Sequence, residues 1–219
     1  MSKTVRPRRS VLYMPGANTR ALEKARSLPA DALIFDLEDA VAPDAKEAAR
    51  TNVVTAAWSK AYGRREIAIR CNGLATAWGE ADVAAIATSG ADAILVPKVE
   101  SATEVTHVVS LLDAAGAPAT MAVWAMMETP KAILRAEEIA GSHPRLALFV
   151  MGTNDLVKDM RARHTPMRLP MVTALGLGML AARATASPSS TASTTTSRTP
   201  RAFAPSASTA SKWASTARP

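Results

Sequence analysis

Short apolar runs rich in Val, Ile and Leu alternate along the first 184 residues with longer stretches that suit amphipathic helices. This alternation is typical of repeated βα units that build a parallel sheet. The predicted strands are Ser10–Tyr13, Ala32–Asp36, Glu66–Arg70, Ala93–Val96, Thr120–Ala125 and Leu146–Met151. The predicted helices are Thr19–Ser27, Ala45–Tyr62, Trp78–Thr88, Ser101–Ala114, Pro130–Ala140 and Met171–Ala184. Because the strand runs are apolar almost throughout, we expect both faces of the sheet to be covered, as in a barrel or a doubly wound sheet.

Several of these helices have recognisable starts. Asn18 or Thr19 can cap the first helix, because a short polar side chain accepts a hydrogen bond from a free N–H of the first turn. Ser101 with Glu104 forms a capping-box pattern, and Thr129 before a proline gives a cap followed by proline at the first helical position.

The character of the chain changes at Thr185. From there to Pro219 most residues are Ala, Ser or Thr, several are Pro, and none is acidic. Such a segment cannot bury enough apolar surface to form a packed core. We therefore expect one structured domain over residues 1–184 and a disordered, low-complexity tail over residues 185–219.

The tail is also compatible with a shifted reading frame. Reading the codons one base earlier turns TCN serine codons into codons for Phe, Leu, Ile or Val, and threonine codons into codons for Asp, Asn, His or Tyr. The segment from Ala186 to Phe203 then reads as a strand that ends in Asp-Gly. We hypothesise that residues 185–219 are the frameshifted product of a gene that encodes further strands. A stop codon or another low-complexity peptide in the shifted frame of the gene would contradict this.

Composition narrows the class of protein. Hydrophobic residues make up 48% of the 219, enough to bury a core. The net charge of +7 is concentrated at the C-terminal end of the chain, since Asp159 is the last acidic residue, and aromatic residues are only 4%. We therefore expect no nucleic-acid partner. Cys71 is the single cysteine, which excludes an internal disulfide framework and fits a cytoplasmic protein. The first apolar run ends at Pro15, too early for a signal peptide, and we expect no membrane span.

Acidic residues follow three of the predicted strands. Asp36, Glu38 and Asp39 lie in ALIFDLEDAV, Glu128 in MAVWAMMETP and Asp155 in LALFVMGTNDL. Parallel strands of a barrel or doubly wound sheet build their sites at their carboxyl ends, so these carboxylates are expected to collect there. Oxygen ligands suit Mg²⁺ or Mn²⁺, which keep several waters and take the other positions from a few side chains and the substrate. The pattern predicts a metal-assisted enzyme.

An ordered set of motifs carries a family resemblance. The segments RSVLYMPGANTRALEKA, DALIFDLEDAVAPDAKEAAR, IAIRCNG, ILVPKVES, AMMETP and GTNDL occur in this order. Together they resemble the citrate lyase beta subunit and malyl-CoA/citramalyl-CoA lyase family of the HpcH/HpaI aldolase superfamily, from about Arg9 to Ala184. The resemblance implies a TIM-type (β/α)₈ barrel of the α/β class, of which this chain carries about six βα units. It also implies Mg²⁺ dependence and cleavage of a 3-hydroxy acyl-CoA to acetyl-CoA and a 2-oxo acid.

The same resemblance assigns roles to individual residues. Glu128 and Asp155 are the expected metal ligands, and Arg70 is expected to bind the carboxylate of the 2-oxo acid, which suits its planar, permanently charged fork. Glu128 is also a candidate substrate contact. The resemblance implies that a C-terminal acidic residue acts as acid or base; under the frameshift hypothesis it would lie in residues 185–219, so no catalytic proton donor is assigned. Asp36, Glu38 and Asp39 are expected to support Arg70 or to contact metal-bound water.

A CoA thioester is the expected substrate. The turn after Tyr13 leads into a helix N-terminus, which favours an anion, and Arg20, Lys24 and Lys46 can meet phosphates. The family resemblance places Tyr13 and these three cations near the nucleotide. Their alternative role is that of ordinary exposed basic residues.

Other functions stay open at this stage. One alternative is a metal-dependent 2-oxo acid aldolase that acts without CoA, and another is a non-catalytic or defective family member that has lost the end of the barrel. The resemblance further implies a homo-oligomer, a trimer or hexamer, possibly with other lyase subunits.

Overall fold

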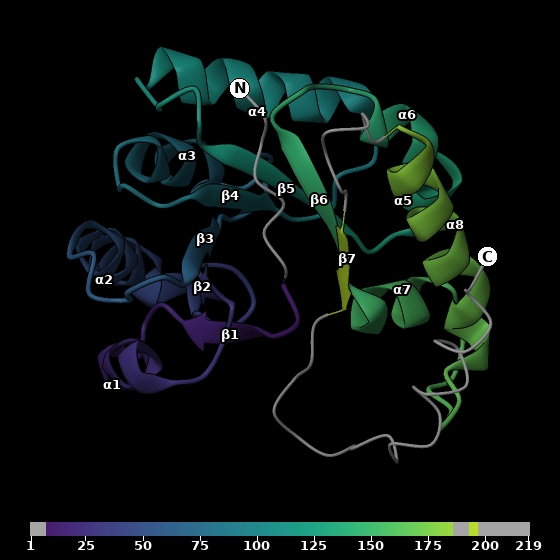
Figure 1. The fold of residues 1–219 in the computed structure, drawn as a ribbon, viewed down its shortest axis with the longest axis horizontal. Helices are drawn as coiled ribbons and strands as arrows, with labels where there is room; N and C mark the ends of the chain where they lie inside the picture. Colours follow the sequence, from purple (N-terminus) through teal and green to yellow (C-terminus); the bar gives the residue numbers. More distant parts are fainter. Residues whose placement is uncertain (1–7, 186–192, 197–219) are drawn as a thin grey trace.

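The computed structural model describes residues 8–185 and 193–196. Its strands are β1 (Val11–Pro15), β2 (Ala32–Asp36), β3 (Glu66–Arg70), β4 (Ala93–Val96), β5 (Ala122–Met127), β6 (Leu146–Met151) and β7 (Ser193–Thr196). They form one parallel sheet in which the strands lie side by side in chain order. Figure 1 shows the sheet curling into an arc, with β1 and β7 at its two ends.

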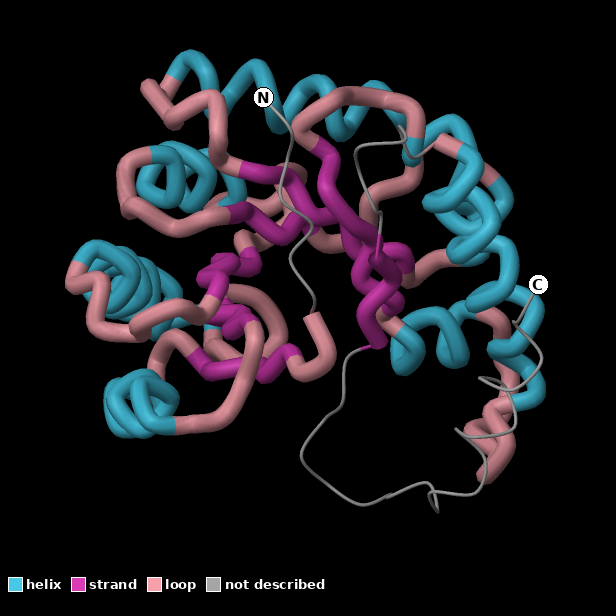
Figure 2. Tube along the Cα trace, in the orientation of Figure 1, coloured by secondary structure: helices cyan, strands magenta, loops and turns pink. Residues whose placement is uncertain are grey.

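Helices follow the strands in turn. They are α1 (Thr19–Lys24), α2 (Lys46–Trp58), α3 (Gly79–Ala87), α4 (Ala102–Ala114), α5 (Pro130–Leu134), α6 (Ala136–Ala140), α7 (Thr153–Asp159) and α8 (Leu169–Ala184), with 3₁₀ turns at Ala25–Ser27 and Pro43–Ala45. Figure 2 shows the helices along the outer side of the arc of strands. A curved parallel sheet with helices outside it is the architecture of a (β/α) barrel, so the predicted fold, a TIM-type barrel truncated after six βα units, is confirmed. Within the described part of the chain, no helix has the length and apolar character to cross a membrane.

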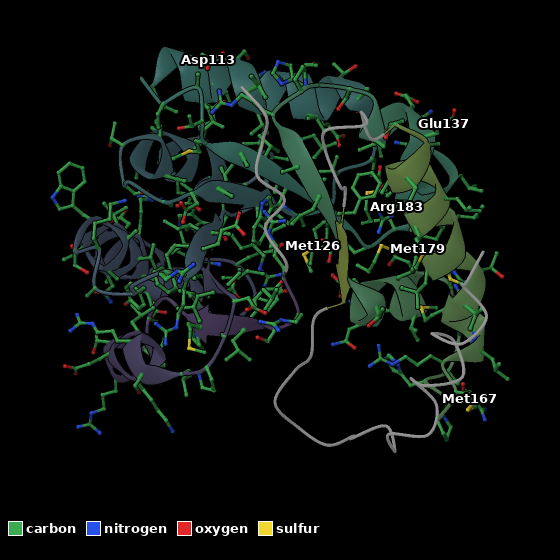
Figure 3. The ribbon with its side chains drawn as sticks, viewed as in Figure 1. Asp113, Met126, Glu137, Met167, Met179 and Arg183 are labelled. Atoms are coloured by element: carbon green, nitrogen blue, oxygen red, sulfur yellow. The ribbon has the colours of Figure 1, made fainter. Side chains whose placement is uncertain are left out.

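Two apolar clusters cover the two faces of the sheet. The outer cluster packs between strands and helices and includes Phe35 and Ile69. The inner cluster lies within the arc and includes Ile34, Trp124 and Met126, the last of which is labelled in Figure 3. Successive residues of a strand face opposite sides, so neighbours such as Ile34 and Phe35 enter different clusters. Burial on both faces explains why the strands have no polar alternation.

An ion pair closes the inner cluster at the amino ends of the strands. Arg8 Nη2 donates to Glu66 Oε1 at 2.8 Å, and the Arg8 guanidinium lies 5.5 Å from the ring centroid of Trp124. Glu66 is the first residue of β3, whereas Arg70 is the last. A site is therefore expected at the other end of the sheet, where the carboxyl ends of the strands lie.

The predicted helix starts are found, with one difference. Asn18 Oδ1 accepts a hydrogen bond from Ala21 N at 3.0 Å, and Thr129 Oγ1 accepts one from Ala132 N at 3.1 Å. Ser101 Oγ also accepts from Glu104 N, but the Glu104 carboxylate accepts from Glu100 N instead of closing the box on Ser101.

Other boundaries differ from the prediction for local reasons. The strands β2, β3, β4 and β6 have the predicted bounds, and β1 and β5 end two residues later. The helix predicted over Pro130–Ala140 is interrupted at Arg135, which has φ −110° and ψ 15°. No glycine or proline marks that break. The short helix α7 was not predicted, because seven residues are too few to show a helical period.

The tail contains a strand that its composition did not predict. Ser193–Thr196 pairs in parallel with β6, with Ser193 opposite Leu148 and Thr196 opposite Met151. The edge of β6 offers unpaired backbone groups, and threonine suits an extended conformation. The expectation of a disordered tail is corrected for these four residues. The rest of the tail, and the frameshift hypothesis, lie outside the described residues.

Candidate active site

Arg70 and Asp36 occupy the carboxyl ends of neighbouring strands. They are the last residues of β3 and β2 and stand opposite each other in the register of the sheet. Arg70 Nε donates to Asp36 Oδ1 at 2.7 Å and Nη2 donates to Oδ2 at 2.6 Å. Both side chains are buried. The two-point contact fixes the plane of the guanidinium at the mouth of the barrel.

Two further carboxylates and an aromatic ring surround Arg70. Glu38 Oε2 lies 2.7 Å and Asp39 Oδ2 lies 3.4 Å from Arg70 Nη1. The guanidinium carbon lies 5.3 Å from the ring centroid of Tyr13. The expectation that Asp36, Glu38 and Asp39 support Arg70 is thus confirmed. Tyr13, predicted for CoA binding, lies beside Arg70, and its buried hydroxyl has no hydrogen-bond partner among the described residues.

The charges of this cluster shift the pKa values of its members. Burial alone lowers the pKa of Arg70, but the hydrogen bonds and charge of Asp36, with the charge of Glu38, raise it above its ordinary value. Burial raises the pKa of Glu38 to about 7, because the opposing charge of Arg70 is offset by Asp39 and Asp36. Burial also raises the pKa of Tyr13.

Glu128 follows β5 and is also buried. Its Oε1 accepts a hydrogen bond from Lys98 N at 2.9 Å. The backbone of Gly152 packs directly on it, so closely that a Cβ on Gly152 would lie 2.6 Å from Glu128 Oε2. Burial, together with the charges of Glu38 and Asp155, raises the pKa of Glu128 to about 7 against the opposing effect of the hydrogen bond from Lys98 N. The same cluster of charges therefore extends from Arg70 to Glu128.

Asp155 lies in the first turn of α7, after β6. Its Oδ2 is 3.9 Å from Lys98 Nζ. Lys98 has a left-handed backbone with φ 50°, a conformation that is uncommon for non-glycine residues, and its N–H donates to Glu128. Glu100, two residues after Lys98, pairs with Lys131 at 2.9 Å.

Glu128 and Asp155 fit the predicted magnesium site in chemistry. Each repels the other's charge, and a cation would relieve that repulsion. No group of three or more His, Cys, Asp or Glu residues in the described chain is arranged to hold a metal. Two carboxylates are nevertheless a sufficient protein share for Mg²⁺, which keeps several waters and takes ligands from its substrate. The metal roles of both residues stay predictions.

Lys46 is buried rather than exposed to a nucleotide. Its Nζ donates to Leu37 O, Glu38 O and Asn72 Oδ1, each at 2.7 Å, so its three donors are all used within the protein. It lies under the loop that carries Glu38 and holds that loop from below. This arrangement favours a structural role for Lys46, and its predicted contact with CoA stays a prediction.

A buried network behind Lys46 was missed from the sequence. Asp82, on α3, accepts hydrogen bonds from Asn72 and from Arg50 Nε, the latter at 2.6 Å. The only signal was the position of Asn72 in IAIRCNG, two residues after Arg70 at the same strand end.

Arg20 and Lys24 lie on α1, the first helix after β1, and both are exposed. Their exposed side chains can meet a phosphate in solution. Among the described residues, no hydrogen bond or ion pair links them to the side chains around Arg70. Their CoA-binding role stays a prediction.

Comparison with known proteins finds relatives that match most of this chain. The chain is 53% identical over 184 residues to (3S)-malyl-CoA thioesterase from Cereibacter sphaeroides strain ATCC 17025, a match that covers 84% of this chain and 62% of that protein. The chain thus spans less than two thirds of the length of this relative.

Solved structures show the same fold. The citrate lyase beta subunit from M. tuberculosis, complexed with oxaloacetate and magnesium, has a TM-score of 0.68 and 25% identity, covering 84% of this chain and 78% of that one. The protein CitE from the same organism, in complex with magnesium, acetoacetate and coenzyme A, has a TM-score of 0.64 and 25% identity, covering 83% and 64%. A model of the HpcH/HpaI aldolase/citrate lyase family matches residues 9–217. The chain therefore belongs to the HpcH/HpaI aldolase/citrate lyase family.

Proposed function

We propose that this chain carries the site of a Mg²⁺-dependent carbon–carbon lyase, which cleaves a 3-hydroxy acyl-CoA of the citryl-, malyl- or citramalyl-CoA type to acetyl-CoA and a 2-oxo acid. The observation that carries the proposal is the pairing of Arg70 with Asp36 at the barrel mouth, in the same charge cluster as Glu128. A fixed cation beside a carboxylate pair is the arrangement that a substrate with a carboxylate and a carbonyl oxygen requires.

Each residue has a part in this proposal. Arg70 binds the carboxylate that becomes part of the 2-oxo acid, and Asp36 keeps the guanidinium from rotating. Glu128 and Asp155 hold the magnesium ion, which when bound polarises the oxygen next to the bond that breaks. Tyr13 offers a buried hydroxyl with no partner among the described residues, positioned beside Arg70 to donate to the substrate.

The relatives support the ligands. The two solved structures are named as complexes with magnesium, one of them with oxaloacetate and the other with acetoacetate and coenzyme A. For this chain, Arg20 and Lys24 on α1 are the proposed contacts for the CoA phosphates.

A second candidate function is hydrolysis of the thioester of (3S)-malyl-CoA. The relative with 53% identity is named for that activity. Both reactions require a site for the acyl-CoA and for the malyl carboxylate, so Arg70 serves either one. They differ in which bond breaks.

The products separate these functions. The purified chain is incubated with Mg²⁺ and citryl-, malyl- or citramalyl-CoA, or with the corresponding free hydroxy acids, and the products are resolved by chromatography. Acetyl-CoA with a 2-oxo acid supports the lyase, and free CoA with the hydroxy acid supports the thioesterase. Turnover of the free hydroxy acids alone indicates the CoA-independent aldolase, and no turnover of any of them indicates a non-catalytic protein.

A control variant ties the activity to the site. Arg70→Met should abolish turnover, whereas Arg26→Met, on the exposed side of the turn after α1, should not change it. Removal of Mg²⁺ with EDTA should abolish turnover as well, and activity that survives in both the Arg70 variant and in EDTA would contradict the proposal.

An oligomer is part of the proposal. The outer side of α8 exposes apolar residues, with Leu169 66%, Met179 54% and Leu180 68% exposed, an unusual surface for a helix that stays in water. This supports a homo-oligomer, predicted to be a trimer or hexamer. Light scattering on the purified chain tests it, and a monomer at all concentrations would contradict it.

A further inference from the structure

Arg70 has two edges that can bind a carboxylate, and Asp36 occupies one of them. Asp36 takes Nε and Nη2, which leaves the edge that carries Nη1. Besides its contacts with Glu38 and Asp39, Nη1 lies 3.7 Å from Met126 Sδ, a weak acceptor that a carboxylate would replace. A carboxylate ligand must therefore approach Arg70 from the Nη1 side.

Glu38 stands on that side. Its Oε2 lies 2.7 Å from Nη1, is buried, and makes no hydrogen bond of good geometry with any described residue. The Glu38 side chain is only 16% exposed, whereas that of Asp39, at 3.4 Å from the same nitrogen, is 69% exposed. Glu38 is therefore the group that covers the free edge most closely.

The backbone of Glu38 is held in place, so only its side chain can move away. Glu38 N donates to Asp36 Oδ1 at 2.9 Å, and Glu38 O accepts from Lys46 Nζ at 2.7 Å. A change of side-chain rotamer is therefore the movement that would clear the Nη1 edge.

We propose that Glu38 and a ligand carboxylate compete for the Nη1 edge of Arg70, so that ligand binding displaces the Glu38 carboxylate and adds a proton to it. The proposal rests on the proposed function, in which Arg70 binds the carboxylate of a 2-oxo acid. Glu38 acts here as a positioning and specificity residue, since it sets which anions can reach Arg70 and at what pH.

The electrostatics have the required direction. Once the ligand takes Nη1, Glu38 loses its main cationic contact and gains a negative neighbour, and both changes favour its protonated form. Burial already holds the pKa of Glu38 at about 7 in the free protein. The charged and titratable groups that act on Glu38, or feel its charge, are Arg70, Asp36, Asp39, Lys98, Glu128, Tyr13, Lys46 and Cys71.

The affinity for a carboxylate ligand should fall as pH rises. Below pH 7 Glu38 is largely protonated and the edge is available, so affinity for a carboxylate is at its plateau. Above pH 7 each binding event must take up a proton, so affinity falls, by about tenfold at pH 8 for a group with a pKa near 7.

Calorimetry with pyruvate as the probe tests this at saturating Mg²⁺, in two buffers of different ionisation enthalpy and from pH 6 to pH 8.5. The wild-type chain should take up about one proton per pyruvate at pH 8. Glu38→Gln should bind pyruvate about tenfold more tightly than wild type at pH 8, with no proton uptake and little pH dependence. Asp39→Asn removes the other carboxylate near Nη1 and should keep the proton uptake.

The Glu38 variants can overturn the proposal. Proton uptake in Glu38→Gln equal to that of wild type, or weaker binding in this variant, overturns the proposal. Glu38→Ala, with circular dichroism to verify its fold, must reproduce the result of Glu38→Gln. Loss of binding in Arg70→Met supports the proposed function by itself, whereas unchanged pyruvate binding in Arg70→Met overturns that function and this proposal together.

Discussion

Asp82 Oδ2 accepts two hydrogen bonds from Asn72, one from its backbone N–H at 2.9 Å and one from its side-chain amide at 2.6 Å. This contact joins α3 to the strand end that carries Arg70, two residues earlier. The other oxygen of Asp82 accepts a hydrogen bond from Arg50, so both oxygens of this fully buried carboxylate are hydrogen-bonded.

Loss of the Asp82 carboxylate should therefore be costly. Asp82→Ala leaves Arg50 and two N–H groups of Asn72 without their acceptor, and we expect the free energy of unfolding to fall by about 3–5 kcal/mol. Chemical denaturation measures it. Asp113→Ala is the matched control, because Asp113 also pairs with an arginine but its side chain is 61% exposed, and its effect should stay within about 1 kcal/mol. Equal effects of the two substitutions would contradict the structural role of Asp82.

Gly152→Ala should disturb Glu128 selectively. The new Cβ would lie 2.5 Å from Glu128 Cβ and 2.6 Å from its Oε2, so the carboxylate must shift. Overpacking of this kind costs about 1–3 kcal/mol of stability, and we expect Mg²⁺ affinity measured by calorimetry to fall as well. Gly176→Ala on α8 has open space around it and should be neutral or slightly stabilising. Unchanged Mg²⁺ binding in Gly152→Ala would argue against Glu128 as a ligand.

Substitutions of Lys46 and Lys24 should have different effects, because Lys46 is buried in the structure and Lys24 is a proposed contact for CoA. Lys46→Met leaves two carbonyls and the Asn72 amide oxygen without a donor, so we expect a loss of about 2–4 kcal/mol of stability. Lys24→Met, on the exposed side of α1, should leave stability within about 0.5 kcal/mol but raise KM for a CoA thioester. The test is thermal unfolding combined with kinetics. A stable Lys46→Met protein would show that the buried ammonium is not needed for the loop.

Glu128 should make the protein less stable as pH rises. Its pKa is raised from 4.5 to about 7 in the folded state, so between these values the folded protein binds more protons than the unfolded chain. The free energy of unfolding then falls as pH rises from about 4.5 to 7, by up to about 3 kcal/mol from this group. Glu128→Gln should remove that part of the slope and stabilise the metal-free protein at pH 8.

Denaturation at pH 5 and pH 8 without metal measures this effect. The slope contributed by Glu38 has the same sign and should remain in Glu128→Gln. Glu137→Gln, an exposed position on α6 that is labelled in Figure 3, should keep the wild-type pH dependence. A steeper slope in Glu128→Gln than in wild type would contradict the assignment.

Much of the fold was predictable because strand positions depend on local apolar runs. The bounds of Ala32–Asp36 and Glu66–Arg70 were correct, and these two strands alone place Arg70 beside Asp36. The break at Arg135 has no local signal, because it depends on how two short helices pack on the rest of the chain.

The positions of candidate site residues were predictable where a charge closely follows a strand, as for Asp155, and not where it lies further along a helix or points beneath a loop. Arg70 and Glu128 were found from their strand ends. The burial of Lys46 and the role of Asp82 could not be predicted, because they depend on contacts between residues more than twenty-five positions apart or on opposite sides of a loop. Nothing in the spacing of a lysine reveals whether its ammonium points outward or beneath a neighbouring loop.

The open side of the arc has a mechanical consequence. In a closed barrel every strand is paired on both sides, whereas in the described residues β1 and β7 are not neighbours. The half of the site that carries Tyr13, Asp36 and Arg70 is then joined to the half that carries Glu128 through β4, a strand of four residues with three paired positions on its β3 side. With β1 and β7 unjoined, the separation of Arg70 from Glu128 depends on the pairing of β3, β4 and β5 and on the helices packed against them, and an element that joined the two free edges would fix that separation from the other side as well.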